Sequence, residues 1–234
     1  MSDQKLSNKQ ENFLRELDRV IERHAMLKHP FYQAWNEGKL TKETLVEYAK
    51  QYYAHVRSFP TYVSAVHSHC DDPPARQMLL ENLIEEERGE NNHPELWLRF
   101  ADSLGVTRRD VQTAELLPST EKSVNTFKKL TQSKVYLEGV AALYAYESQI
   151  PDVARTKREG LKKFYGIEDE RSVSFFTVHE TADLLHRQGE RDILAQHCST
   201  KSEKTAVLKA AEEAGRALWN FLDGVHEAYC RLKI

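Results

Sequence analysis

The chain has 234 residues, of which 40% are hydrophobic and 29% are charged, and its formal net charge is −3. This length and composition suffice for one sizeable core and predict a single domain over residues 1–234. The balanced charge indicates neither nucleic acid nor an anionic membrane surface as a partner. No apolar run reaches the length of a membrane span, and the polar start "MSDQKLSNKQEN" does not resemble a signal peptide.

The cysteines Cys70, Cys198 and Cys230 are few, odd in number and far apart in the sequence. They indicate reduced thiols and a cytoplasmic location rather than a disulfide framework. Because none of them lies in a C-x-x-C pair, the sequence does not favour a zinc-ribbon site.

The expected secondary structure is helical throughout. Only nine glycines and seven prolines punctuate the chain, and few segments are rich in β-branched residues, so we predict an all-α fold. The expected arrangement is one bundle of about seven or eight helices. In chain order they cover residues 8–27, 30–37, 41–69, 73–104, 119–150, 151–165, 170–197 and 203–231.

Proline marks several of the expected helix boundaries. Pro30 suits the first turn of the short second helix. The "DDPP" stretch at 71–74 is expected to end one helix and begin the next. Pro151 is expected to kink or split the helix that contains Glu147, because a proline inside a helix removes a backbone hydrogen bond.

The stretch "SFFTVHETADLLHRQGERD", residues 174–192, carries three polar residues within an apolar helical pattern. His179, Asp183 and His186 occupy positions i, i+4 and i+7, which lie on one face of a regular helix. A buried carboxylate is costly unless it has a partner such as a metal or a cation. The plainer alternative is that these are ordinary core or boundary residues with hydrogen-bond partners.

Two further segments carry polar groups of the same kind. Glu86 and His93 are seven residues apart in "EEERGENNHP", with Glu90 on the same expected helix face. This stretch also reads as an ordinary solvated acidic face. Glu147 follows the apolar run 139–146, and its alternative role is a cap or a salt bridge near the next helix break.

Together the three segments offer three carboxylates and three imidazoles, namely Glu86, His93, Glu147, His179, Asp183 and His186. This set suits two first-row metals such as iron or manganese, held between facing helices. It lacks the thiolates that favour a structural zinc, and it lacks the paired Glu-x-x-His motif of ferritin-like di-iron proteins. The spacing predicts that one helix, 170–197, could serve both metals.

The stretch "HPFYQAWNEGKLTKETLVEYAKQYY", residues 29–53, resembles the N-terminal segment of the thiaminase II and pyrroloquinoline-quinone synthase superfamily. The order Glu-x6-His, a lone Glu and His-x3-Asp-x2-His is similar to that of haem-oxygenase-like dimetal oxidases, in particular the group of the chlamydial death-domain-associating protein. The resemblance covers nearly the whole chain and implies a haem-oxygenase-like fold. It also implies a di-iron or mixed manganese–iron centre that activates O2 with electrons from an external reductant.

The same resemblance implies an oxidoreductase that makes p-aminobenzoate for folate. Members of this group are implicated in consuming one of their own tyrosines as the source of the ring, in a single turnover, with a lysine as the amino donor. Carried over by position, the tyrosine is Tyr32 in "HPFYQAW" and the lysine is Lys157 in "VARTKREG", while Tyr48 and Tyr146 match other tyrosines near the active site. Without the resemblance, the basic residues around Lys157 predict that its side chain is exposed to solvent. Burial would lower its pKa and so favour the neutral amine that a donor needs.

Several alternatives stay open. A dimetal oxidase of this fold can act on an external amino acid or fatty acid. A metal-free enzyme similar to quinone synthase or thiaminase II needs no such ligand set, and neither does a non-enzymatic interaction protein. Tyr52 and Tyr144 are expected to be ordinary core tyrosines. The sequence separates neither iron from manganese nor a monomer from a homodimer.

Overall fold

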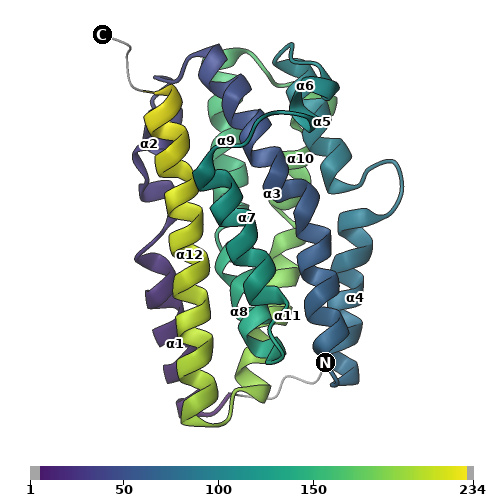
Figure 1. The fold of residues 1–234 in the computed structure, drawn as a ribbon, viewed down its shortest axis with the longest axis vertical. Helices are drawn as coiled ribbons and strands as arrows, with labels where there is room; N and C mark the ends of the chain where they lie inside the picture. The colour runs from purple at the N-terminus through teal and green to yellow at the C-terminus, as the bar shows by residue number, and fades with distance from the viewer. Residues whose placement is uncertain (1–5, 231–234) are drawn as a thin grey trace.

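The computed structural model describes residues 6–230, which form twelve α-helices and one 3₁₀ helix and contain no β-strand. The all-α prediction is confirmed. The elements are α1 (Asn8–Glu22), η1 (Met26–Lys28), α2 (Pro30–Asn36), α3 (Lys42–His69), α4 (Pro73–Glu87), α5 (His93–Ser103), α6 (Arg108–Gln112), α7 (Pro118–Thr131), α8 (Tyr136–Glu147), α9 (Ile150–Tyr165), α10 (Glu170–His179), α11 (Ala182–His197) and α12 (Lys201–Tyr229). The long helices α3 and α12 run along the longest axis of the molecule (Figure 1). Within residues 6–230, no helix combines the length and apolar character that crossing a bilayer requires.

Helix α8 is the central element of the core. It packs against α7, α11 and α12, and every residue from Gly139 to Glu147 is buried. Such a helix has no polar face, so it is stabilised by packing on all sides rather than by amphipathic burial. Because α8 ends at Glu147, the carboxylate of this residue lies in the protein interior.

Helices α2 and α9 approach each other closely through Gly160. A Cβ atom at Gly160 would lie 2.7 Å from Cδ1 of Trp35, a distance that real Cβ atoms do not reach. The Trp35 indole N–H donates a hydrogen bond to the Lys157 backbone carbonyl at 3.2 Å. This contact satisfies the one polar group of a fully buried indole and places Lys157 beside α2.

The proline-marked boundaries are confirmed. Pro30 is the first residue of α2, where the Phe31 backbone N–H donates to Nδ1 of His29. Asp72 caps α4 by accepting a hydrogen bond from the Ala75 backbone N–H. Pro151 lies in the first turn of α9 and separates that helix from α8.

Three of the expected helices are each divided in two. Residues 73–104 form α4 and α5, residues 119–150 form α7 and α8, and residues 170–197 form α10 and α11. The first division has a clear cause, since Gly89 adopts a positive φ of 81° and the Asn92 side chain then caps α5. A left-handed residue ends a helix, and glycine adopts that conformation without a steric penalty.

Candidate active site

Six buried side chains form two groups of three near the centre of the bundle. The first triad is Glu86, His93 and His179, and the second triad is Glu147, Asp183 and His186. In each triad, one donor atom from each residue lies within 4.8 Å of the others. All six side chains belong to residues that are at most 6% exposed. The structure thus brings together the six residues that the sequence singled out.

The triads are built from helix ends. His93 is the first residue of α5, Glu147 is the last residue of α8, and His179 is the last residue of α10. Backbone groups at helix ends are not all used by the helix itself, and the chain can change direction there. The helix breaks therefore allow side chains from five helices to converge.

The prediction that His179, Asp183 and His186 share one helix face is wrong. Helix α10 ends at His179, and Asp183 lies in the first turn of α11. Because of this break, His179 belongs to the first triad, whereas Asp183 and His186 belong to the second triad. Glu90, expected on the face of Glu86, is instead exposed in the loop between α4 and α5.

The first triad combines one carboxylate with two imidazoles. His93 Nδ1 lies 2.8 Å from Glu86 Oε1, yet the atoms do not have the geometry of a hydrogen bond. His179 donates a hydrogen bond from Nδ1 to the Phe175 carbonyl at 2.6 Å, which leaves its Nε2 with a free lone pair. Burial and the neighbouring His93 hold the pKa of His179 well below its usual range. His179 is therefore neutral, as a metal ligand must be.

The second triad combines two carboxylates with one imidazole. His186 Nδ1 lies 3.2 Å from Glu147 Oε1 and 3.6 Å from Asp183 Oδ1. Burial and the Glu147 carboxylate raise the pKa of Asp183 to about 7. Although burial opposes the charged imidazole, the carboxylates of Asp183 and Glu147 beside it raise the pKa of His186 to about 11. The imidazole of His186 is thus the shared partner of two buried carboxyl groups, those of Glu147 and Asp183.

The donor atoms fit metal ions. His93 Nδ1, Glu147 Oε2, Asp183 Oδ2 and His186 Nδ1 are buried and have no hydrogen-bond partner. Burying each such atom without a partner costs about 1–3 kcal/mol, or more when the atom is charged. Because these atoms lie close together, a bound ligand that interacts with several of them would remove this cost. A cation at each triad does so, and the mixture of carboxylate and imidazole suits first-row metals.

Two residues that sequence reasoning missed surround the second triad. Asn82 donates a hydrogen bond from Nδ2 to Glu147 Oε1 at 3.0 Å. Glu85 Oε2 lies 3.2 Å from His186 Nε2, on the ring edge opposite the triad. Such outer contacts orient ligands and set the imidazole tautomer. A signal for Asn82 was available, because it lies one helical turn before Glu86 on the buried face of α4.

Lys157 and two tyrosines form a buried cluster. Lys157 is 2% exposed, and its Nζ donates a hydrogen bond to the Tyr48 hydroxyl at 2.7 Å. The Tyr48 and Tyr32 hydroxyls are 3.0 Å apart and hydrogen-bonded, and Nζ lies 5.1 Å from the centre of the Tyr32 ring. Burial holds the pKa of Lys157 well below its usual range. The interpretation of Lys157 as a surface lysine is therefore wrong, and its burial favours the neutral form of the amine.

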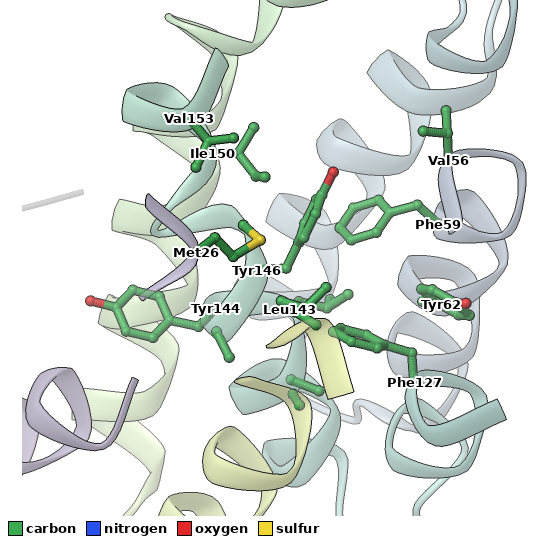
Figure 2. Close-up of a cluster of buried hydrophobic side chains, with 14 of the residues drawn as sticks. Met26, Val56, Phe59, Tyr62, Phe127, Leu143, Tyr144, Tyr146, Ile150 and Val153 are labelled. Atoms are coloured by element: carbon green, nitrogen blue, oxygen red, sulfur yellow. The ribbon is translucent and has the colours of Figure 1, made fainter. Parts of the chain in front are cut away.

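A second tyrosine pair links this cluster to the first triad. The Tyr52 and Tyr146 hydroxyls are hydrogen-bonded at 2.6 Å, and the Tyr52 ring stacks on Tyr48 with centroids 5.4 Å apart. Tyr146 packs against Phe59 at a centroid distance of 4.9 Å (Figure 2). Tyr146 also lines a cavity of about 10 Å³ together with Glu86, His93 and His179. Tyr52 thus belongs to a chain of contacts from the cavity to Tyr32.

Tyr144 lies outside this chain of contacts. Its hydroxyl donates a hydrogen bond to Asp18 at 2.8 Å and accepts one from Arg191 at 2.6 Å. Figure 2 shows its ring pointing away from Tyr146. Tyr144 is therefore a core tyrosine whose hydroxyl has ordinary partners, as expected from the sequence.

Comparisons with known proteins identify the family of the chain. Residues 46–219 match the family described as iron-containing redox enzymes. The chain is 46% identical over 227 residues to the 4-aminobenzoate synthase of Nitrosomonas europaea, which covers 93% of this chain and 92% of that protein. It is 43% identical over 212 residues to the 4-aminobenzoate synthase of Chlamydia trachomatis, covering 91% of each. The fold is similar to that of a TenA homologue from Pseudomonas syringae, with a TM-score of 0.80, 16% identity and coverage of 93% and 92% of the two chains. The chain therefore belongs to the haem-oxygenase-like family of iron-containing redox enzymes.

Proposed function

We propose that this chain makes 4-aminobenzoate in an O2-dependent reaction, with its own Tyr32 as the source of the ring and Lys157 as the amino donor. Two relatives at 46% and 43% identity bear the name 4-aminobenzoate synthase. The observation that carries the assignment of residues is the buried contact of the Lys157 amine with the hydrogen-bonded pair Tyr48 and Tyr32.

The size of the cavity favours an internal substrate. The cavity at the first triad measures about 10 Å³, which is room for about one water molecule. A free amino acid or a fatty acid does not fit there, whereas Tyr32 is already in the core at 1% exposure. The alternative of an external substrate would require the packed helices to open.

The two triads are the residues that would hold the metals. Bound iron or manganese would supply the capacity to activate O2 with electrons from an external reductant. The protein contributes a buried, water-excluding surround, in which Trp35 and Trp97 are fully buried. It also orients His179 through the Phe175 carbonyl.

The tyrosines and the lysine supply proton partners for the ring chemistry. Each hydroxyl in the Tyr146–Tyr52 and Tyr48–Tyr32 pairs has a hydroxyl partner, so a proton that leaves one oxygen is accepted at the next. Burial raises the pKa of Tyr48, so its hydroxyl stays neutral beside the amine. Burial lowers the pKa of Lys157 and so favours the neutral amine, whose free lone pair an amino donor needs.

A reaction without added substrate tests this proposal. The purified chain, loaded with Fe(II) and Mn(II), is given a reductant and air, and both 4-aminobenzoate and the intact protein mass are measured. We expect no more product than protein, with a mass loss at Tyr32. Protein grown with ring-labelled tyrosine and, separately, ε-¹⁵N-lysine is expected to transfer each label to the product.

Matched variants complete the test. Tyr32→Phe and Lys157→Arg are expected to abolish product formation. Tyr144→Phe, a buried tyrosine outside the chain of contacts, and Lys162→Arg, an exposed lysine on the same helix, are expected to leave it unchanged. Metal-loaded protein that consumes O2 but yields unlabelled product or none would contradict self-consumption and would point to an external substrate.

A further inference from the structure

One buried carboxyl group beside the second triad has no part in the site described so far. Glu190 lies on α11, seven residues after Asp183 and four after His186, so the three share one helix face. It is 1% exposed, neither of its carboxyl oxygens has a partner with full hydrogen-bond geometry, and the carboxyl group of Glu147 lies within reach of it. A buried carboxyl group without a partner is costly, so its burial requires an explanation.

The surroundings of Glu190 are acidic. The charged groups that act on it are the carboxylates of Glu147 and Asp183, both of which belong to the second triad. Glu147 also has one carboxyl oxygen without a partner, as does Asp183. The single imidazole of His186 cannot balance three buried acids that face one another, so they destabilise the interior unless a metal cation lies among them.

We propose that Glu190 is a fourth protein ligand of the metal at the second triad, alongside Glu147, Asp183 and His186. This inference rests on the proposed dimetal site. It accounts for the burial of Glu190 and for its two orphaned oxygens, since a carboxylate that binds a cation needs no hydrogen-bond donor. It makes the second position a site of three carboxylates and one imidazole, a ligand set that is rich in oxygen and suits Mn(II).

Metal binding by variants tests the role of Glu190. Wild type, Glu190→Gln and Glu190→Ala are titrated with Mn(II), and free Mn(II) is followed by electron paramagnetic resonance. We expect wild type to bind two ions, and each variant to lose affinity for one of them by about tenfold or more, because even outer partners of ligands cost about that much. Asp192→Asn, on the same helix and partly exposed with Gln188 as its partner, is the matched control and is expected to bind as wild type does.

A crystal structure of the Mn(II)-loaded protein gives a readout that is independent of activity. A Glu190 oxygen within bonding distance of the ion would establish it as a ligand. A Glu190 side chain remote from both ions, or variants that bind both ions with wild-type affinity, would overturn the inference while leaving the dimetal site intact. Wild-type protein that fails to bind two ions would overturn the dimetal site as well. Thermal melting in chelator checks that the variants are folded.

Discussion

The two triads use the same kinds of side chain in opposite proportions. The first has one carboxylate and two imidazoles, whereas the second has two carboxylates and one imidazole. In the first, Glu86 lies beside His93 and raises its pKa against the effect of burial. In the second, one imidazole serves two acids, and the pKa of Asp183 rises to about 7. The one carboxylate of the first triad can thus be balanced by an imidazole without a metal ion, whereas the two carboxylates of the second exceed its one imidazole.

The largest expected effect comes from removing one carboxylate from either triad. Glu147→Ala and Glu86→Ala are each expected to lower 4-aminobenzoate formation by more than about 100-fold, since loss of a ligand exceeds the roughly 10–100-fold cost of losing an outer contact. Product yield and metal content per chain are measured together. Retained activity in Glu147→Ala would sink the assignment of that residue as a ligand.

The stability of the metal-free protein is expected to respond with opposite signs at the two triads. Asp183→Asn should stabilise the protein at pH 8 by up to about 4 kcal/mol, because it removes a buried acid whose ionisation is opposed while Glu147 remains as the charged partner of His186. Glu86→Gln should destabilise it by about 1–3 kcal/mol, because His93 then loses its charged partner. Urea unfolding in the presence of chelator measures both differences.

The pH dependence of urea unfolding shows whether Asp183→Asn acts by removing the cost of ionising a buried acid or by changing the packing around it. The folded-state pKa of Asp183 lies above its usual value of 3.8. Folded protein therefore binds the proton more tightly, and this residue makes stability fall as pH rises from about 4 to 7. Below about pH 4 the carboxyl group is protonated in both states, so the advantage of Asp183→Asn should vanish there. An advantage that is constant with pH would contradict the electrostatic explanation.

Metal preference should also differ between the triads. Carboxylates suit Mn(II), whereas imidazoles suit iron and zinc. We expect Glu147→Gln to weaken Mn(II) binding about tenfold more than Glu86→Gln, because it acts on the triad that is richer in carboxylates. Titration with Mn(II) followed by electron paramagnetic resonance measures the difference. Equal losses would show that ligand proportion does not set the preference.

The smallest expected effects come from the outer contacts of the second triad. Asn82→Ala should lower metal affinity by about tenfold, since Asn82 is buried and orients Glu147. Glu85→Gln should have a smaller effect, because the Glu85 side chain is 48% exposed and its interaction with His186 is screened by solvent. Calorimetric titration compares the two variants, and a larger effect for Glu85→Gln would reverse this ranking.

The helical class and the identity of the triad residues could be predicted from the sequence, but their geometry could not. Apolar periodicity shows where helices are, whereas the break after His179 has neither glycine nor proline to announce it. Convergence of the triads depends on packing between helices far apart in the chain. The order and spacing of the Glu, His and Asp residues in the sequence therefore indicated the site. Only the tertiary structure shows which of them share a triad.

Lys157 and Glu190 show that charged neighbours in the sequence are a poor guide to whether a side chain is buried. Lys157 lies among basic residues, which indicated a solvated side chain, and Glu190 lies in the charged stretch "RQGERD" and was assigned no role from the sequence. Yet Lys157 falls at helical spacing among the buried residues of α9, Val153, Ala154, Gly160 and Leu161, and Glu190 follows His186 by one turn. The position on the helix was the better signal, because burial is set by the face on which a side chain lies.

The dense packing around Tyr32 has a consequence for the protein after reaction. Tyr32 is 1% exposed and packs between Phe31, Trp35 and Tyr48. On the proposed function, loss of its ring leaves a hole in the core, equivalent to a large-to-small substitution that costs about 3–5 kcal/mol. That is a large share of the 5–15 kcal/mol by which a typical domain is stable. The spent chain would then unfold more readily than the fresh one, and the same chemistry that releases the product would mark the used protein for proteolysis.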